Sequence, residues 1–195
     1  MRIKAPLLVL AFLAMPGAAF GQAAPATDQP PSCRAGQDFS RETEAFIAQE
    51  INAARAEAMP GAPALRFDEQ LTRIAERRAC ELAGTGKALS HLDDKGHLEA
   101  ADIVFSVFSP YGLVGENLMR LRVPGDAVIW NAEDVARTAA KLWLNSPAHR
   151  RHILNPRYDQ SGIGVALVGG EVVAAQVFHG PPRRTAQAAA KAKGR

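Results

Sequence analysis

The chain has 195 residues, of which 47% are hydrophobic and 22% are charged, as in an ordinary globular protein. This length favours one domain with tails. Its net charge of +3 comes from the ends, because residues 1–21 and 181–195 contain basic residues but no acidic ones. The body between them carries 16 basic and 20 acidic residues, which argues against a nucleic-acid partner.

The first 21 residues have the pattern of a secretory signal peptide. Arg2 and Lys4 precede an apolar run over residues 5–20, and small residues before Gln22 suit cleavage after Gly21. The run is short and broken by proline, so we expect no membrane span after cleavage; an uncleaved anchor is the alternative. The protein is therefore predicted to be secreted or periplasmic.

Composition divides the rest of the chain into three parts. Residues 22–38 are rich in Ala, Pro, Gln, Asp and Ser and are predicted to form a linker. Residues 39–180 are predicted to fold, and residues 181–195 are predicted to be a basic disordered tail, since they are Ala-rich and open with two prolines. In an oxidising compartment, Cys33 and Cys80 are expected to form a disulfide; two buried or free thiols are the alternative.

Two helices are predicted at the start of the folded part. The first begins near Ser40, repeats apolar residues at helical spacing and ends at Pro60. The second is capped by Asp68. Its expected buried face is Leu71, Ile74, Ala75, Ala79 and Leu82, with its arginines and glutamates outside. Residues 98–109 are too densely apolar for the period to separate a helix from irregular chain.

The last third of the domain is predicted to contain helices followed by a hairpin. Residues 133–144 form a helix with Val135, Ala139, Leu142 and Trp143 on one face. A short helix follows, with Ser146 as its cap and Pro147 at its first position. Strands at 162–168 and 171–178 are joined by two glycines, a strong hairpin signal. The fold class is therefore α+β, with helices on a small antiparallel sheet.

Three residues are candidates for chemistry. His149 falls in the first turn of the short helix, where the macrodipole favours the neutral imidazole that binds metal or accepts a proton. His91 precedes an acidic turn containing glycine. Glu116 is expected in a loop between Gly115 and Asn117, and is hard to explain as a solvated charge. Two imidazoles and a carboxylate suit a divalent metal or acid–base chemistry.

Four motifs together resemble the CAP superfamily of cysteine-rich secretory proteins, antigen 5 and pathogenesis-related 1, and in particular its bacterial secreted branch. They are ALSH at 88–91, GENL at 115–118, WLNSPAHRRHILNPRYDQSGIGVAL at 143–167 and AQVF at 175–178. The resemblance extends over roughly residues 40–179 in family order. It implies an α-β-α sandwich with a central cavity.

In the family that the chain resembles, two histidines and two glutamates line the cavity and hold a divalent metal in some members. By position, His91, Glu116 and His149 match three of these residues, which makes them the implied cavity and metal ligands. Glu116 and His149 are also the implied catalytic candidates. The second glutamate is missing near residues 145–146, and Glu99 or Asp102 would replace it only if the chain folded back. We therefore expect zinc to bind weakly and the fold to survive chelation.

The resemblance leaves three functions open. The first is a non-catalytic module that binds a lipid-like or sterol-like ligand, or an envelope component. The second is a hydrolase, in particular a peptidase, that uses Glu116 and the histidines with or without metal. The third is an interaction domain at the cell envelope. If the protein binds a lipid-like ligand, apolar residues of the middle segment are candidates to line the binding groove; the alternative is that they belong to the core. They are Ile103, Phe105, Phe108, Tyr111 and Leu113. We rank binding above catalysis and expect a monomer.

Overall fold

The computed structural model describes residues 37–93, 95–108, 112–122 and 131–182. The predicted signal peptide, Cys33, Tyr111 and all but the first two residues of the predicted tail lie outside this part of the chain.

The described part contains five helices and four strands. The helices are α1 (Gln37–Ala58), α2 (Glu69–Leu82), α3 (Glu99–Val107), α4 (Ala132–Asn145) and α5 (Pro147–Ile153). The strands are β1 (Arg66–Phe67), β2 (Leu113–Arg122), β3 (Gln160–Val168) and β4 (Glu171–Gly180). The predicted helices and the hairpin are confirmed, and the ambiguous segment at 98–109 is a helix, α3.

The four strands form one sheet in the order β1-β3-β4-β2. The three long strands are antiparallel, and Gly169 and Gly170 form the β3–β4 turn with φ of 57° and 75°. The two-residue strand β1 pairs in parallel with the start of β3, which makes the sheet mixed. The prediction that Glu116 lies in a loop is wrong, because Glu116 lies within β2, paired opposite Val177.

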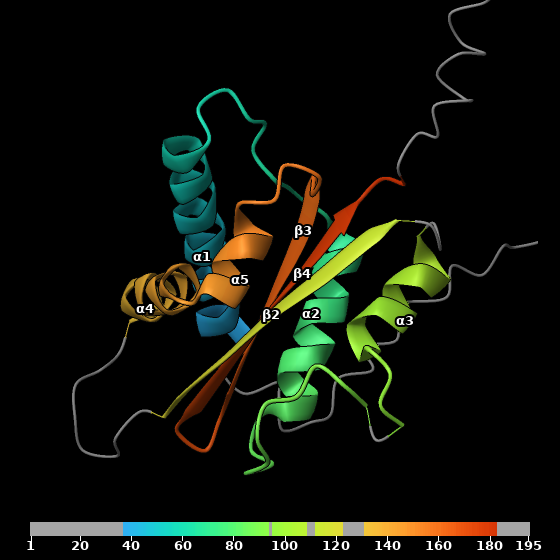
Figure 1. Cartoon of the computed structure of the whole chain (residues 1–195). Coiled ribbons are helices and arrows are strands. Elements are labelled where there is room, and N and C mark those ends of the chain that lie inside the picture. Colours follow the sequence, from blue (N-terminus) through green and yellow to red (C-terminus); the bar gives the residue numbers. More distant parts are fainter. Residues whose placement is uncertain (1–36, 94, 109–111, 123–130, 183–195) are drawn as a thin grey trace, which may run out of the picture.

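Helices cover both faces of the sheet, as Figure 1 shows, with α1, α4 and α5 on one side and α2 and α3 on the other. Alternate side chains of β4 enter the two layers. Val172, Ala174 and Phe178 pack with α1, α4 and α5, whereas Val173, Ala175 and Val177 pack with α2 and α3. The α-β-α sandwich of the CAP fold is therefore confirmed.

Two glycines of β3 allow α2 to lie directly against the sheet. A Cβ atom on Gly162 would lie 2.0 Å from the carbonyl carbon of Leu71, and one on Gly164 would lie 2.0 Å from the backbone nitrogen of Glu76. Only glycine permits this approach of helix and strand. The glycines thereby set the depth at which α2, and its side chains, meet the sheet.

Two features of the predicted helix starts are resolved by the structure. The Asp68 side chain accepts hydrogen bonds from the backbone N–H groups of Gln70 and Leu71, so the predicted cap of α2 is confirmed. Pro147 occupies the first turn of α5 as predicted, and Ser146 stands at the cap position without a side-chain hydrogen bond.

The predicted buried faces of the helices need correction at three positions. Arg78 of α2 was expected outside and is only 2% exposed. Leu82 is only partly buried, and Leu142 of α4 is 45% exposed. In α4 the buried face is centred on small residues and Trp143, which rotates Leu142 out of the core: Ala132, Val135, Ala136, Ala139, Ala140 and Trp143.

The apolar residues of the middle segment are mainly core residues. Ile103 and Phe108 pack against the α2–α3 side of the core, and Leu113 packs against the other side. These three residues therefore support the core explanation rather than a groove. No helix in the described ranges is long and apolar enough to cross a membrane.

Candidate functional site

The candidate site lies at the outer edge of β2, where the two helical layers meet. β2 is the last strand of the sheet, so one of its edges has no strand beside it within the described residues. Because side chains alternate along a strand, Glu116 faces α2 and α3 whereas Asn117 faces the layer that contains α5. Residues from both layers therefore surround the same strand edge.

Glu116 is the central residue of this cluster. It is 8% exposed, and both of its carboxylate oxygens have partners. Oε1 accepts a hydrogen bond from Nε of Arg78 at 3.0 Å, and Oε2 lies 2.7 Å from Nδ1 of His91. A buried carboxylate is stable only when its charge is balanced and its oxygens are hydrogen-bonded, and these two residues supply both.

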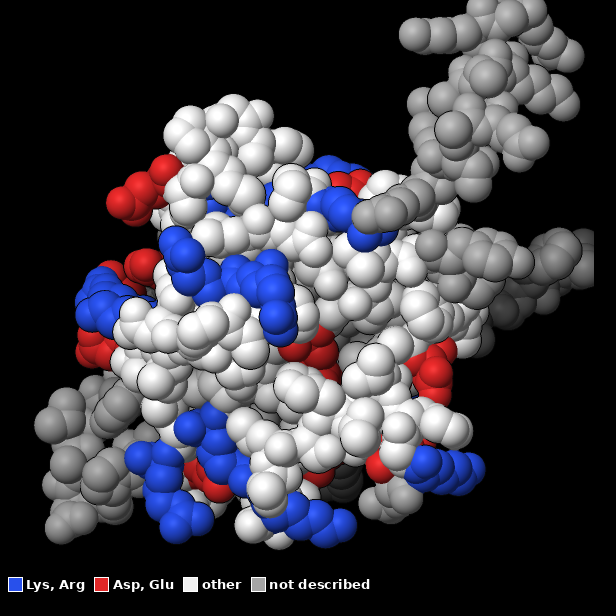
Figure 2. All heavy atoms as spheres, viewed as in Figure 1, with Lys and Arg blue, Asp and Glu red and all other residues white. Residues whose placement is uncertain are grey.

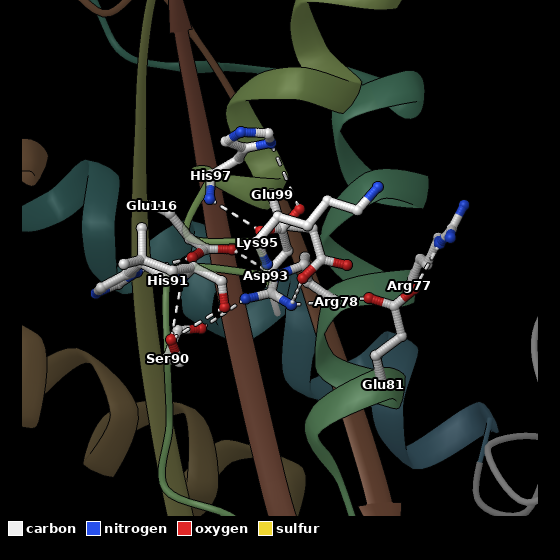
Figure 3. Close-up of polar contacts among 11 residues, drawn as sticks. Arg77, Arg78, Glu81, Ser90, His91, Asp93, Lys95, His97, Glu99 and Glu116 are labelled. Atoms are coloured by element: carbon white, nitrogen blue, oxygen red, sulfur yellow. Dashed lines mark hydrogen bonds and ion pairs between the residues drawn. The ribbon is translucent and has the colours of Figure 1, made fainter.

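Arg78 connects four segments of the chain through one guanidinium group, as Figure 3 shows. Besides Glu116 on β2, its Nη1 donates to Glu99 Oε2 at 2.6 Å at the start of α3. Its Nη2 donates to the carbonyl oxygen of Ser90, also at 2.6 Å. Arg78 thus fixes the backbone next to His91 and, through Glu116, the His91 ring.

The contact with Glu116 determines which nitrogen of His91 is free. A carboxylate can only accept, so Nδ1 of His91 carries the proton and donates it to Glu116. In the neutral ring, the Nε2 atom then has a lone pair and can accept a hydrogen bond or bind a metal. The side chain of His91 is 44% exposed, so this lone pair is accessible to a ligand.

Two histidines of α5 complete the cluster from the opposite layer. The carbonyl oxygen of His149 accepts from Nδ2 of Asn117 at 3.3 Å. His152 Nδ1 lies 3.2 Å from the Glu116 carbonyl oxygen and 3.1 Å from Asn117 Oδ1. Burial, followed by the charges of His91 and His152, lowers the pKa of His149. Burial also lowers the pKa of His152, so both imidazoles are held in the neutral form.

A second buried arginine positions α5. Arg55 of α1 is 2% exposed and donates from Nη1 to the carbonyl oxygens of Ile153 and Asn155 at the end of α5. Its Nη2 donates to the carbonyl oxygen of Pro63. Cations at a helix C-terminus are favourable, and here one cation also fixes the helix that carries His149 and His152.

The structure brings His91, Glu116 and His149 to one strand edge and adds two residues that the sequence reasoning missed. One is His152, whose i,i+3 spacing from His149 on a helix indicated a shared face. The other is Arg78, for which no local signal existed.

The two carboxylates considered as replacements for the missing glutamate lie in different places. Glu99 reaches the cluster through its contact with Arg78, whereas Asp102 lies at the surface, 3.7 Å from His97.

His179 lies outside this cluster. It is 7% exposed, its Nδ1 lies 3.1 Å from Gln160 Oε1, and its ring packs on Phe108 with centroids 4.8 Å apart. Burial lowers its pKa. These contacts give His179 a structural role between β4 and α3.

The cluster as arranged does not fit a divalent metal bound through Glu116. Both oxygens of Glu116 are engaged, one of them by a permanent cation, Arg78. Within the described residues, no group of three or more His, Cys, Asp or Glu side chains could hold a metal ion. The predicted weak zinc site is therefore reduced to the two imidazoles of His91 and His149, and remains a prediction.

Basic residues lie beside the cluster. Figure 2 shows blue side chains gathered over α5, where Arg150 and Arg151 are exposed. Neither arginine forms an ion pair within the part of the chain that the structure describes. The open side of the cluster is therefore bordered by unneutralised positive charge.

Comparison with known proteins identifies the family. The family model described as "CAP: Cysteine-rich secretory protein family" matches residues 48–178, about two thirds of the chain. The chain belongs to the CAP family. The sequence search of curated proteins found no match.

Solved structures agree with the CAP fold. An outer surface protein of Borrelia burgdorferi superposes with a TM-score of 0.57 at 19% identity, covering 74% of this chain and 95% of that protein. An extracellular protein of Bacillus anthracis containing an SCP domain gives a TM-score of 0.53 at 22% identity over 73% of this chain. This chain spans 41% of that longer protein. At these identities the likeness shows the fold alone.

Only one cysteine of the predicted disulfide, Cys80, lies within the described residues. Cys80 is 5% exposed in α2, and no cysteine in the described ranges is free. Cys33 lies outside the described residues. The Cys33–Cys80 pairing therefore remains a prediction.

Proposed function

We propose that this CAP protein is exported and acts by binding a ligand at the outer edge of β2, through the accessible imidazoles of His91 and His149. The observation that carries the proposal is that both carboxylate oxygens of Glu116 have partners, one in Arg78 and the other in His91. A carboxylate with both oxygens engaged is a poor base, but it fixes the ring of His91, whose side chain is 44% exposed. The cluster is thus prepared to accept hydrogen bonds.

The chemistry of the cluster limits the ligand class. Neutral imidazoles accept hydrogen bonds from hydroxyl groups, such as those of sterol-like lipids and of envelope polymers. The exposed arginines of α5 favour an anionic group next to those hydroxyls, since guanidinium pairs well with phosphate and carboxylate. Among the ligands expected from the sequence, an anionic envelope component therefore fits better than an uncharged lipid.

Histidine NMR tests this proposal on the mature chain. Envelope polymers and lipids are added in turn, and the ring signals of His91 and His149 are expected to shift with one of them. His91→Ala and His149→Ala should each weaken binding about tenfold or more, as expected for loss of a hydrogen bond to a buried partner. His97→Ala is the matched control, because the His97 side chain is 62% exposed and pairs with Asp93 and Asp102 rather than with Glu116. A ligand that binds equally well to all three variants would refute the proposal.

Export is tested separately. Mass spectrometry of the periplasmic and secreted fractions should find a chain that begins near Gln22, as the signal-peptide pattern predicts. An intact chain starting at Met1 in the cytoplasm would refute this part of the proposal.

A second function, hydrolysis, is favoured by one observation. The Glu116–His91 pair has the arrangement in which a carboxylate orients a histidine that acts as general base. In this alternative, water is the nucleophile, because Ser90 Oγ is engaged with the backbone of Leu92. Peptide cleavage that is lost in His91→Gln and retained in His97→Gln would favour this alternative over simple binding.

A further inference from the structure

We propose that Arg78 is a resident cation that keeps Glu116 from binding divalent metals, so that the cluster accepts hydrogen-bonding ligands instead. This inference deepens the proposed function, since it assigns the residue that determines the specificity of the same site. Arg78 acts through Glu116 and is therefore a positioning residue.

The contacts of Arg78 show how firmly it is held. Each of its three guanidinium nitrogens donates to a different acceptor, and its side chain is 3% exposed. Two of the acceptors are carboxylates, Glu116 and Glu99. An arginine cannot lose its proton under ordinary conditions, so its charge at Glu116 is permanent, whereas the charge of a metal depends on metal concentration and pH.

A divalent ion would have to displace this network before it could reach Glu116. Displacement would break the Arg78–Glu116 contact and leave a buried guanidinium with one anionic partner fewer, which is strongly unfavourable. It would also free His91 Nδ1 from Glu116, and with it the ring orientation. If Arg78 stayed in place, the ion would sit next to a fixed positive charge.

Removing the guanidinium should therefore create a better metal site. In Arg78→Met, Glu116 and Glu99 both lose their cation, and Glu116 lies directly beside His91. Without the guanidinium, Glu116 has a free oxygen beside His91 and becomes available as a carboxylate donor, a type that zinc binds together with imidazole. The wild-type chain has only the two imidazoles.

Calorimetry with zinc alone tests the proposal on the mature chain. We expect weak zinc binding by the wild type and binding tighter by about tenfold or more in Arg78→Met. Arg78→Met combined with Glu116→Gln should return to the wild-type level. Arg78→Lys, which retains a cation, should remain weak. The matched control is Arg73→Met, because Arg73 lies on the same helix and pairs at the surface with Glu69. Its zinc affinity should equal that of the wild type.

A measurement on the wild type keeps the proposal falsifiable if Arg78→Met does not fold. On zinc titration, the ring signals of His91 and His149 should shift while the carboxyl carbon signal of Glu116 stays in place. A zinc-dependent shift of the Glu116 carboxyl, or unchanged or weaker zinc binding by a folded Arg78→Met, would overturn the proposal. A negative ligand panel would refute the proposed function and leave these zinc results standing, so the two can fail separately.

Discussion

A glutamate lies at each of two edges of the sheet, and the two differ in their partners and in their charge. At the β2 edge, Glu116 contacts the guanidinium of Arg78 and the ring of His91. At the far side of the sheet, Glu44 of α1 accepts a hydrogen bond from the backbone N–H of Val165 at 2.9 Å, on the part of β3 that β1 does not cover. The pKa of Glu44 is raised to about 8, mainly by burial and to a smaller extent by the nearby Glu76. The hydrogen bond from the Val165 N–H group and the charge of Arg41 oppose this rise.

The difference shows that a direct cation, rather than burial, determines whether a carboxylate in this fold serves as a charge. Glu116 has a guanidinium in contact and acts as a charged hydrogen-bond acceptor in the candidate site. Glu44 accepts a hydrogen bond from the backbone of Val165 and is protonated at neutral pH, so it closes the edge of β3 as a neutral group. The β2 edge is therefore suited to binding a ligand, whereas at the β3 edge Glu44 stabilises the contact between α1 and the sheet.

The two edges should also respond to pH in opposite directions. The pKa of Glu44 is about 8 in the folded chain, above its ordinary value of 4.5, so its contribution to stability is complete below about pH 4.5 and is lost as pH rises toward 8. The pKa values of His149 and His152 are lowered from 6.5 in the folded chain, so their contribution is present above 6.5 and is lost as pH falls.

The largest predicted effect is at the β2 edge. Arg78→Met should lower the free energy of unfolding by about 3–5 kcal/mol, because it leaves Glu116 and Glu99 without their cation. Urea denaturation at pH 7 measures this. Arg73→Met is the control, since the Arg73–Glu69 pair is exposed and should contribute less than about 1 kcal/mol. Equal losses in the two variants would contradict the central role of Arg78.

A smaller effect is predicted at the β3 edge. Glu44→Gln keeps a carbonyl acceptor for the Val165 N–H group but cannot ionise. Between pH 5 and pH 8 the wild type should therefore lose roughly 3 kcal/mol of stability more than the variant. Urea denaturation across this range measures the difference. In Glu42→Gln, where the glutamate is exposed on the same helix, the wild-type pH dependence should persist.

The smallest effect concerns the histidines. His152→Asn keeps a hydrogen-bonding group near the Glu116 carbonyl but removes a titratable ring. Between pH 7 and pH 5 the variant should lose less stability than the wild type, by about 1 kcal/mol or less. Thermal unfolding at the two pH values measures this, with His97→Asn as the exposed control. A steeper loss in His152→Asn would contradict the lowered pKa of His152.

The sequence by itself determined the elements whose signals are local. The Asp68 cap, the glycine pair of the hairpin and the apolar spacing of α1 and α4 each act over a few residues. The helices α1, α2, α4 and α5 and the β3–β4 hairpin follow from such patterns, whereas the dense apolar pattern of α3 left its structure open. The family motifs likewise pointed to His91, Glu116 and His149, which the structure places around one strand edge.

Only the tertiary structure decided which ionisable side chains are buried and which of them carry a charge. Arg78 looks like any exposed arginine of an amphipathic helix, and its burial depends on Glu116 and Glu99, which are 38 and 21 residues away in the sequence. The glycines of β3 bring α2 close enough for that contact, and they too act across the fold. Periodicity shows which face of a helix is apolar. Whether a buried charge is stable depends on partners from other elements, and no short pattern contains them.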